Sequence, residues 1–407
     1  MAHTLITFLG NVAHDKGGQY AFTTYEVEQQ QFSCRFMGLG LAQALKIPRI
    51  RILGTSGSMW DVLLDQLGAT RDESAWVGLS DAVRQDQVTQ ALLHSFEREL
   101  NASQSAHVFE LRLLPYGFEE DKQVDILHAL SSGLDGKEHE VTLDITHGMR
   151  HLPVLGMLSM MYLQSIGHAT VRNVFYGVFD RKNPVNPVVN LSGLLHIQEW
   201  IKCLDQFDKD GDYSVFSPLL KRDGLPGQLL EEAAFLERIG NLSLAQQKLN
   251  TFWQTQERPR TPASIMFFPV LQSRLNWRRS AKRSQWERTL GMEFLARKDY
   301  LRSVIFCYES RISAEVEKTG GDANNFEFDR EAAEKSLESQ ARDSRMEFGS
   351  AHNFYPLKYL RNQLAHGIRA KVESSLWAQA ETARFVNSLT KNEQKLQQWL
   401  SAALKSA

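Results

Sequence analysis

The first half of the chain alternates short apolar runs with stretches of helical periodicity, and no other feature restricts its fold as much. Five apolar runs have the length expected of buried strands, at 5–9, 50–53, 108–113, 141–145 and 171–178. Segments with the helical period lie among them, at 32–45, 59–67, 83–100, 124–130 and 152–166. Strands that alternate with helices predict a parallel-rich sheet with helices on both faces, which is an α/β domain.

The strand patterns end near Leu194, and only helical patterns follow. These lie at 194–207, 228–239, 244–253, 263–277, 285–316 and 376–400. We therefore expect an α/β plus all-α protein, and its 407 residues suffice for two or three domains. The expected parts are an α/β domain over 1–195, a helical connector over 196–284 and a helical domain over 285–407.

Charge and cysteine content disfavour some classes of protein. The formal net charge is only −2, so a contact with nucleic acid has to come from a local surface. The three cysteines, Cys34, Cys203 and Cys307, are odd in number and far apart. This argues against a disulfide framework and a zinc cage, and it suits a reducing cytosol.

No segment has the pattern of a secretion signal or a membrane span. The apolar run at 5–9 is too short for a signal core and lacks a basic flank. The segment at 154–166 comes closest to a span, but Gly156, Ser159 and Gln164 interrupt it, so we interpret it as a buried helix. We expect a cytoplasmic protein with no membrane partner.

The loops that follow the strands are the candidate binding segments, because ligands of such sheets bind beyond the carboxyl ends of the strands. Gly10 and Asn11 follow the first strand, where glycine allows a ligand to approach the backbone closely. An ordinary turn is the alternative, and the G-x-G-x-x-G dinucleotide motif is absent.

The second strand is followed by small hydroxyl residues, Thr55, Ser56 and Ser58. Hydroxyls and free amides at a helix start suit a phosphate group. The alternative weighs about as much, since Ser58 and Asp61 have the spacing of a capping box for the next helix.

The densest polar cluster follows the strand at 141–145 and reads Asp144-Ile145-Thr146-His147-Gly148-Met149-Arg150-His151. Pro153 suits an early helix position, so the cluster lies between a strand end and a helix start. Backbone N–H groups face outward there and Arg150 adds a bidentate partner, so we favour phosphate or nucleotide binding. In one alternative, both residues have a structural role: Asp144 caps a turn and His147 is a histidine with its hydrogen bonds satisfied inside the protein. Another is a metal site of His147 and His151, which lacks the glutamate of the metalloprotease pattern.

The stretch Asp144-Ile145-Thr146-His147-Gly148 resembles the D-x-T-H-G signature of CRISPR-associated proteins with a CARF domain. The resemblance extends roughly to Leu195 and includes Phe8-Leu9-Gly10, Leu53-Gly54-Thr55, Ser58-Met59-Trp60-Asp61 and Phe175-Tyr176-Gly177. It implies a Rossmann-like sensor that dimerises and binds cyclic oligoadenylate across its two-fold axis, with the tetra-adenylate ring favoured. The ligand contacts that it implies are Gly10, Asn11, Thr55, Ser56, Ser58, Thr146, His147, Gly148, Met149 and Arg150.

A second motif near the C-terminus contains Arg361, Asn362, His366 and Gly367. Asn362 and His366 are four residues apart, so on a helix they share a face with Arg361 beside them. Histidine moves protons near neutral pH and a guanidinium stabilises a phosphorane-like transition state, so the set suits metal-independent RNA cleavage by the 2′-hydroxyl. Asn362 would orient His366 or hold a phosphate oxygen. The plain alternative is a helix with an exposed arginine and a histidine near its C-terminus.

This stretch resembles the R-x-x-x-x-H motif of HEPN ribonucleases, and a HEPN domain behind a CARF domain is a known pairing. The HEPN-like region covers about 285–400. The resemblance implies that two protomers bring Arg361 and His366 together, in a homodimer or a higher even oligomer. Both resemblances together imply an allosterically activated endoribonuclease of type III CRISPR antiviral defence, acting on single-stranded RNA without cofactor or metal and leaving a 2′,3′-cyclic phosphate.

Other interpretations stay open. A non-enzymatic cyclic-nucleotide sensor would regulate a partner through the helical half. A nicotinamide or flavin oxidoreductase is disfavoured by the missing glycine motif. The sensor domain also has candidate groups, Thr146 and His147, for cleaving its own activator.

Local charge is concentrated between Arg258 and Arg302, where eleven Lys or Arg stand against three acidic residues. Trp277 and Trp286 lie among them. The stretch is either an RNA track with stacking aromatics or the solvated face of connector helices with the tryptophans in the core, and we favour the second.

Overall fold

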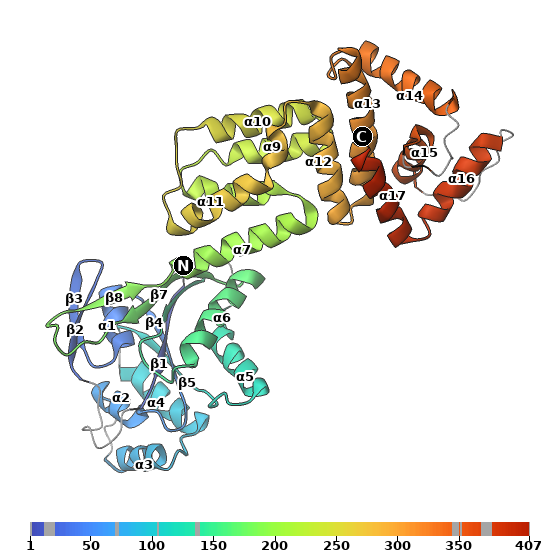
Figure 1. Ribbon diagram of the computed structural model, residues 1–407. Coiled ribbons are helices and arrows are strands. Elements are labelled where there is room, and N and C mark those ends of the chain that lie inside the picture. Colours follow the sequence, from blue (N-terminus) through green and yellow to red (C-terminus); the bar gives the residue numbers. More distant parts are fainter. Residues whose placement is uncertain are drawn as a thin grey trace. The chain divides into compact units, whose positions relative to one another are not determined.

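The computed structural model describes residues 2–11, 21–69, 73–103, 106–134, 139–343, 350, 352–367 and 377–406. The chain divides into two compact units, Met1–Gln198 and Glu199–Ala407, and each is described by itself. The first contains the sheet and the second is helical (Figure 1). The expected boundary between connector and terminal domain, at 284–285, lies inside the second unit and stays a prediction.

The described residues of the first unit form one eight-stranded sheet with the order β3-β2-β8-β7-β6-β1-β4-β5. The strands are β1 His3–Leu9, β2 Thr23–Val27, β3 Gln30–Cys34, β4 Arg49–Gly54, β5 Val108–Leu113, β6 Glu140–Asp144, β7 Thr170–Gly177 and β8 Asn186–Asn190. The five from β7 to β5 are all parallel, whereas β8 is antiparallel to β7 and β3 is antiparallel to β2. The expected parallel-rich α/β sheet is therefore present.

Strand order reverses at β1, because the chain passes from β1 to β4 and β5 on one side and then to β6 and β7 on the other. The crevice at such a reversal is where open α/β sheets bind ligands. In the register, Leu9 lies opposite Gly54 and Thr7 lies opposite Asp144. The loops after β1, β4 and β6 therefore leave from the same edge of the sheet.

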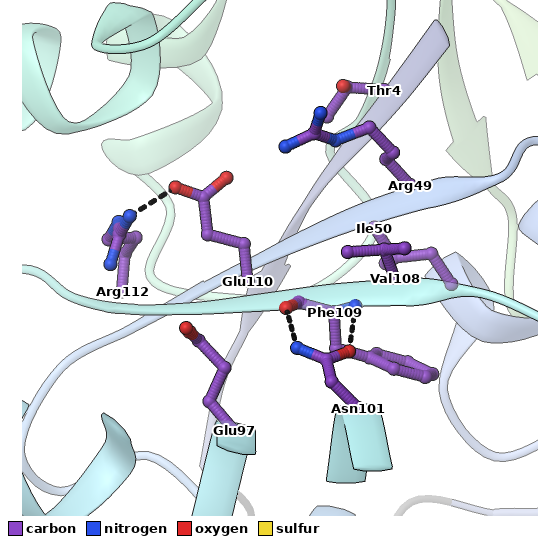
Figure 2. Close-up of a pocket in the computed structure, with 9 residues that line it drawn as sticks. All are labelled: Thr4, Arg49, Ile50, Glu97, Asn101, Val108, Phe109, Glu110 and Arg112. Carbon is purple, nitrogen blue, oxygen red and sulfur yellow. Dashed lines mark hydrogen bonds and ion pairs between the residues drawn. The ribbon is translucent and has the colours of Figure 1, made fainter. Parts of the chain in front are cut away.

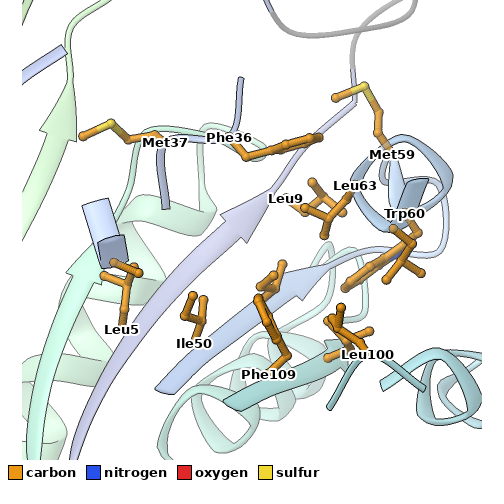
Figure 3. Packing of buried hydrophobic residues seen from close by; sticks show 14 of the residues in the cluster. Leu5, Leu9, Phe36, Met37, Ile50, Met59, Trp60, Leu63, Leu100 and Phe109 are labelled. Carbon is orange, nitrogen blue, oxygen red and sulfur yellow. The ribbon is translucent and has the colours of Figure 1, made fainter. Parts of the chain in front are cut away.

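Helices cover both faces of the sheet (Figure 1). They are α1 Met37–Ala44, α2 Trp60–Gln66, α3 Glu73–Arg84, α4 Gln90–Ser103, α5 Glu120–Ser131 and α6 Leu152–Ile166. β1 contributes to both cores, since Leu5 and Leu9 belong to the cluster with Trp60 while Ile6 and Phe8 belong to the cluster with α5 and α6. Figure 3 shows the first of these clusters, with Trp60 packed beside Leu63 at the end of the strands.

Several local predictions for this unit were wrong. Residues 32–34, assigned to a helix, are the end of β3, and α1 begins only at Met37. The helix expected over 83–100 is two helices, α3 and α4, and Asp86 between them has a φ of 57°. The strands β2, β3 and β8 were not predicted, and β3 and β8 leave most of their residues at least partly exposed.

One side of α6 is buried and the other is exposed, so the interpretation as a buried helix was half right. Leu152, Leu155 and Leu163 pack on the sheet. A stripe at four-residue spacing, the α6 stripe, is exposed and consists of Val154, Leu158, Tyr162 and Ile166. The 15 residues of α6 include no charged side chain. Within the described part of the chain, no helix combines the length and the apolar content needed to cross a membrane.

The edge strand β5 is protected by side chains of α4. The amide of Asn101 accepts a hydrogen bond from the N–H of Phe109 and donates one to its carbonyl, both at 2.8 Å (Figure 2). Glu97 accepts from the N–H of Leu111 at 2.6 Å. Gln90 donates to the Leu111 carbonyl and accepts from the Leu113 N–H. The helix thus takes the place of a further strand along this edge.

The second unit is built from helices, and α7 Gly193–Asp210 runs across the division between the units. The others are α8 Ser217–Arg222, α9 Gln228–Arg238, α10 Leu242–Gln254, α11 Pro262–Arg274, α12 Arg283–Ala296, α13 Tyr300–Thr319, α14 Glu331–Asp343, α15 Phe354–Ala365, α16 Trp377–Leu389 and α17 Glu393–Lys405. Short helical turns lie at Tyr213–Phe216, Asn276–Arg279 and Phe326–Arg330.

Two helices expected to be continuous are interrupted. The segment 285–316 breaks between α12 and α13, where Lys298 has a φ of 62° and Asp299 caps α13 by accepting from the N–H of Arg302 at 3.0 Å. The segment 376–400 breaks before α17, which Asn392 caps by accepting from the N–H of Lys395. Both caps satisfy N–H groups that a continuous helix would have bonded internally.

The C-terminal part of the second unit has its own core around α13. Val304, Cys307 and Val316 of α13 are fully buried and cluster with Leu360 of α15 and Leu400 of α17. Because α13 lies at the centre of this bundle, side chains on it can fix the position of residues on α15.

Candidate functional site

The first candidate site lies at the edge of the sheet where β1, β4 and β6 end, and Asp144 holds it together. Asp144 is fully buried and accepts hydrogen bonds from Thr7 Oγ1 at 2.7 Å, from Thr146 N at 3.0 Å and from Thr146 Oγ1 at 2.5 Å. Thr146 Oγ1 in turn accepts from the N–H of Gly177 at 2.8 Å. Burial raises the pKa of Asp144, and the hydrogen bonds from Thr146 and Thr7 oppose that rise. One carboxyl group therefore ties together the ends of β1, β6 and β7.

His147 is turned into the protein rather than toward solvent. Its Nε2 accepts a hydrogen bond from the N–H of Met37 at 3.2 Å, which leaves the proton of the neutral ring on Nδ1. Burial lowers the pKa of His147 to about 4, so the ring is neutral at pH 7. A neutral histidine whose acceptor nitrogen is already bonded is poorly suited to act as a general base in this arrangement.

Gly148 turns the chain so that the next two residues face solvent. Its φ is 96°, and a Cβ placed there would lie 3.0 Å from the Cβ of Phe8. Met149 and Arg150 are both exposed. Arg150 makes no hydrogen bond or ion pair with any described residue. Its guanidinium at the start of α6 is therefore available to an anion.

The metal interpretation gains no support from the two histidines. His151 Nε2 lies 2.8 Å from the carbonyl oxygen of Tyr116, whereas His147 faces Met37. Among the described residues there is no group of three or more His, Cys, Asp or Glu side chains arranged to hold a metal ion.

The loop after β4 packs onto the end of β1, and the capping-box prediction for Ser58 was wrong. The helix α2 starts at Trp60 with Met59 as its N-cap and has no side-chain cap. Ser58 Oγ instead donates to the carbonyl of Leu9 and accepts from the N–H of Thr55, both at 2.9 Å. Thr55 and Ser58 are buried, and Ser56 donates to Asp86.

Gly10 is brought into the same group, because its carbonyl accepts from the N–H of Met59 at 3.0 Å, and Asn11 is exposed beside it. The predicted ligand residues thus lie on loops of one edge. Most of their hydroxyl and imidazole groups are used inside the protein. The exposed side chains of this set are Asn11, Met149 and Arg150.

Residues of the loop after β5 also reach this edge and were missed by sequence reasoning. Tyr116 Oη donates to Asp86 Oδ1 at 2.6 Å, and Phe118 is exposed next to it. The strand at 108–113 was predicted from the sequence. Because ligands of such sheets bind beyond the carboxyl ends of the strands, the loop after this strand could have been included among the candidate binding segments.

A cavity of about 230 Å³ between the sheet and α4 lies away from these loops (Figure 2). It is lined by Thr4, Arg49 and Val108, at the amino ends of β1, β4 and β5, together with α4 side chains. Its position at the opposite end of the strands makes it no part of the candidate ligand site.

The second candidate site lies at the C-terminal end of α15. Arg361 is half-buried, with its Cζ 4.5 Å from the ring centroid of Tyr308 on α13 and its Nη1 donating to Asn362 Oδ1 at 2.8 Å. Asn362 therefore holds Arg361 and not the His366 ring. His366 is exposed at the C-cap position, where its N–H donates to the Asn362 carbonyl at 3.1 Å. Gly367 has a φ of 77°, as expected for a helix-ending glycine.

A polar network fixes the position of Tyr308, the ring that Arg361 contacts. Tyr308 Oη donates to Glu334 Oε1 at 2.5 Å, and Lys358 Nζ donates to the same oxygen at 2.7 Å and to Glu338. Burial raises the pKa of Glu334, but the hydrogen bonds from Lys358 and Tyr308 and the charges of Lys358 and Arg361 outweigh it and lower the pKa. The carboxylate stays ionised at neutral pH and fixes the ring on which the guanidinium rests.

The basic stretch between Arg258 and Arg302 agrees only in part with the favoured interpretation of a solvated face with the tryptophans in the core, because Arg278 and Arg283 are buried and Trp286 is half-buried. Arg283 is buried and paired with Glu287, and Arg274 makes two hydrogen bonds to Asp208. Trp277 is buried, so no stacking surface is available on it.

Comparisons with known proteins connect the first unit to CRISPR systems. Residues 4–180 match the family model described as "CRISPR system endoribonuclease Csx1, CARF domain". A CRISPR-associated protein of Methanocaldococcus jannaschii is 22% identical over 203 residues, which cover 45% of this chain and 32% of that protein. The alignment thus spans about a third of the relative's length. The first unit contains a CARF domain, of the kind carried by CRISPR-associated proteins.

Proposed function

We propose that this protein is a type III CRISPR endoribonuclease of the cytoplasm, activated when its CARF domain binds cyclic oligoadenylate. The observation that carries the catalytic part is the placement of Arg361, whose guanidinium is held by Tyr308 and Asn362 at the helix end that exposes His366. The catalytic domain is proposed to cover 285–407, with a helical connector over 196–284 before it.

The edge of the sheet where β1, β4 and β6 end suits a ring of phosphodiesters. The loops after β1, β4 and β6 meet at the point where strand order reverses, and the exposed Arg150 lies at the start of α6. Backbone amides and the positive end of a helix dipole favour phosphate oxygens there. Asn11 and Arg150 are the proposed side-chain contacts, while Thr55, Ser58, Thr146 and His147 shape the loops that offer backbone groups. The tetra-adenylate ring is the favoured activator.

Cleavage would use the substrate's own 2′-hydroxyl. The 2′-oxygen attacks the adjacent phosphorus of a single-stranded RNA, its proton leaves to a base, and the 5′-oxygen departs with a proton from an acid. His366 would serve these proton transfers, and Arg361 would stabilise the charge on the phosphorane-like transition state. The products are a 2′,3′-cyclic phosphate and a 5′-hydroxyl, and no metal takes part.

One chain supplies a single Arg361 and a single His366, so the proposal includes a homodimer or a higher even oligomer. The α6 stripe supports pairing, because Val154, Leu158, Tyr162 and Ile166 expose apolar surface on a helix without charges. A face without charge does not repel its own copy. The stripe begins next to Arg150, so pairing through it would bring two ligand loops toward one two-fold axis.

The decisive experiment measures cleavage of a labelled single-stranded RNA in EDTA, with no activator or with cyclic tri-, tetra- or hexa-adenylate. The expected result is cleavage with one ring size and a 2′,3′-cyclic phosphate at the new 3′ end. Ring binding without any RNA cleavage would instead favour a non-enzymatic sensor that regulates a partner. Cleavage that requires a divalent metal would contradict the assigned chemistry.

A further inference from the structure

The loop after β5 holds one aromatic ring fixed and exposes a second one on top of it. Tyr116 is anchored by its hydroxyl, which donates to Asp86 Oδ1 at 2.6 Å, and by its carbonyl oxygen, 2.8 Å from His151 Nε2. The rings of Tyr116 and Phe118 are stacked, with centroids 5.6 Å apart and planes inclined by 12°. Phe118 is nevertheless 74% exposed, so the stack leaves much of its ring in water.

Glycines on both sides allow this arrangement. A Cβ on Gly57, in the loop after β4, would lie 3.0 Å from both Asp86 Oδ1 and the Tyr116 hydroxyl oxygen. Gly117 has a φ of 73°, and a Cβ on it would lie 2.7 Å from Ile126. The aromatic loop therefore lies directly against the loop after β4 and against His151, the residue that follows Arg150.

Charge separates two zones of this edge. Asp86 lies beside Tyr116, and its carboxylate disfavours a phosphate at that point. Arg150, at the start of α6, attracts one. If the phosphate of a nucleotide lies near Arg150, its base and not its phosphate is the part that can contact the loop with Tyr116 and Phe118.

We propose that Phe118 is a stacking surface for a purine base of the bound ligand, with Tyr116 and Asp86 as positioning residues. This inference rests on the proposed function, in which the ligand is a cyclic oligoadenylate. The face of Phe118 away from Tyr116 receives the adenine, and a planar ring loses little conformational entropy when it does so. Purines stack more strongly than pyrimidines, so the ring contributes to selection of adenine.

The test compares Phe118→Leu, which keeps apolar volume but has no ring face, with Phe118→Trp. Calorimetry gives the dissociation constants of cyclic tetra-adenylate and cyclic tetra-uridylate. Phe118→Leu is expected to weaken tetra-adenylate binding by about 5- to 150-fold, as removal of one base–aromatic stack does elsewhere, and to weaken tetra-uridylate binding less. Phe118→Trp is expected to restore the affinity. Phe235→Leu, at an exposed phenylalanine of α9, is the matched control and should bind as the wild type does.

The outcomes separate this inference from the proposed function. If the wild-type protein binds cyclic tetra-adenylate and Phe118→Leu binds it equally well, stacking is wrong and the sensor function stands. If the wild type binds no cyclic oligoadenylate, the proposed function itself is wrong. A change from dimer to monomer in Phe118→Leu, seen by light scattering, would assign the ring to a contact between copies of the chain and overturn the stacking role.

Discussion

The guanidinium of Arg361 lies on the ring of Tyr308, with 4.5 Å from its Cζ to the ring centroid. A cation over an aromatic face is stabilised by about 0.5–2 kcal/mol, and here the contact also limits where the arginine can point. Tyr308→Leu should therefore lower kcat for RNA cleavage about 10-fold with little change in KM, because the substrate still binds but the guanidinium is no longer fixed.

Tyr308→Phe is the matched variant for this contact. It keeps the ring and removes only the hydroxyl that donates to Glu334, so most of the activity should return. Tyr308 is buried, so thermal unfolding of both variants has to show a folded protein. A folded Tyr308→Leu protein with wild-type kcat would remove Tyr308 from the catalytic arrangement.

His366→Ala should reduce RNA cleavage at least about 100-fold, since the proposed proton-transfer group is lost. The residue is exposed at the end of α15, so its removal leaves no cavity in the core. Binding of cyclic tetra-adenylate should stay at the wild-type level. His352→Ala, at another exposed histidine of the same unit, is the control. Wild-type cleavage by His366→Ala would exclude His366 from the reaction.

Arg150→Ala should raise the activator concentration needed for half-maximal cleavage about 10-fold while leaving the maximal rate unchanged. The reason is that Arg150 would contact a phosphate of the ligand and has no role near the RNA. The shift should shrink at high salt, because exposed charge interactions are screened. Arg98→Ala, at an exposed arginine of α4, should not change the activation curve. An unchanged curve for Arg150→Ala would place the anion elsewhere.

Glu237 predicts a pH dependence of stability. Burial, with a smaller contribution from the Glu293 carboxylate, raises the pKa of Glu237 to about 8 from an ordinary value of 4.5. The folded protein then binds a proton between these values that the unfolded chain has lost, so stability falls as the pH rises from 4.5 to 8. Glu237→Gln should remove this loss, so the variant gains stability relative to the wild type at pH 8.5 and not at pH 4.5. Urea unfolding of the wild type and the variant at both pH values measures the difference in their free energy of unfolding. Glu257→Gln, at an exposed glutamate, is the control.

The strands β1, β4 and β6 were predictable because they are buried on both faces, which gives largely apolar runs such as that of β1. Residues 32–34 of β3 were assigned to a helix because the strand is largely polar and its pattern continues into α1 without a marked break. The break before α13 falls at Lys298, and no glycine or proline announces it.

The candidate ligand residues were singled out by their position after strands, and Arg361, Asn362 and His366 by their spacing on a helix, but the partners of these side chains were not predicted. Ser58 has the spacing of a helix cap, yet its hydroxyl bonds to Leu9, 49 residues away. Tyr308 lies far from Arg361 in sequence and meets it only because α13 and α15 pack together. Local spacing predicts which side chains share a loop or a helix, whereas tertiary packing decides which of them remain free for a ligand.

The cover that α4 gives to β5 has a consequence for the chain during synthesis. Many copies emerge close together on a polysome, and a bare strand border is a template on which neighbouring copies add strands without limit. At Phe109 and Leu111 that template is already occupied from within the same molecule by Asn101, Glu97 and Gln90. Once α4 has docked, the backbone groups of Phe109 and Leu111 are already bonded, so this border gives a neighbouring copy no free groups there on which to add a strand.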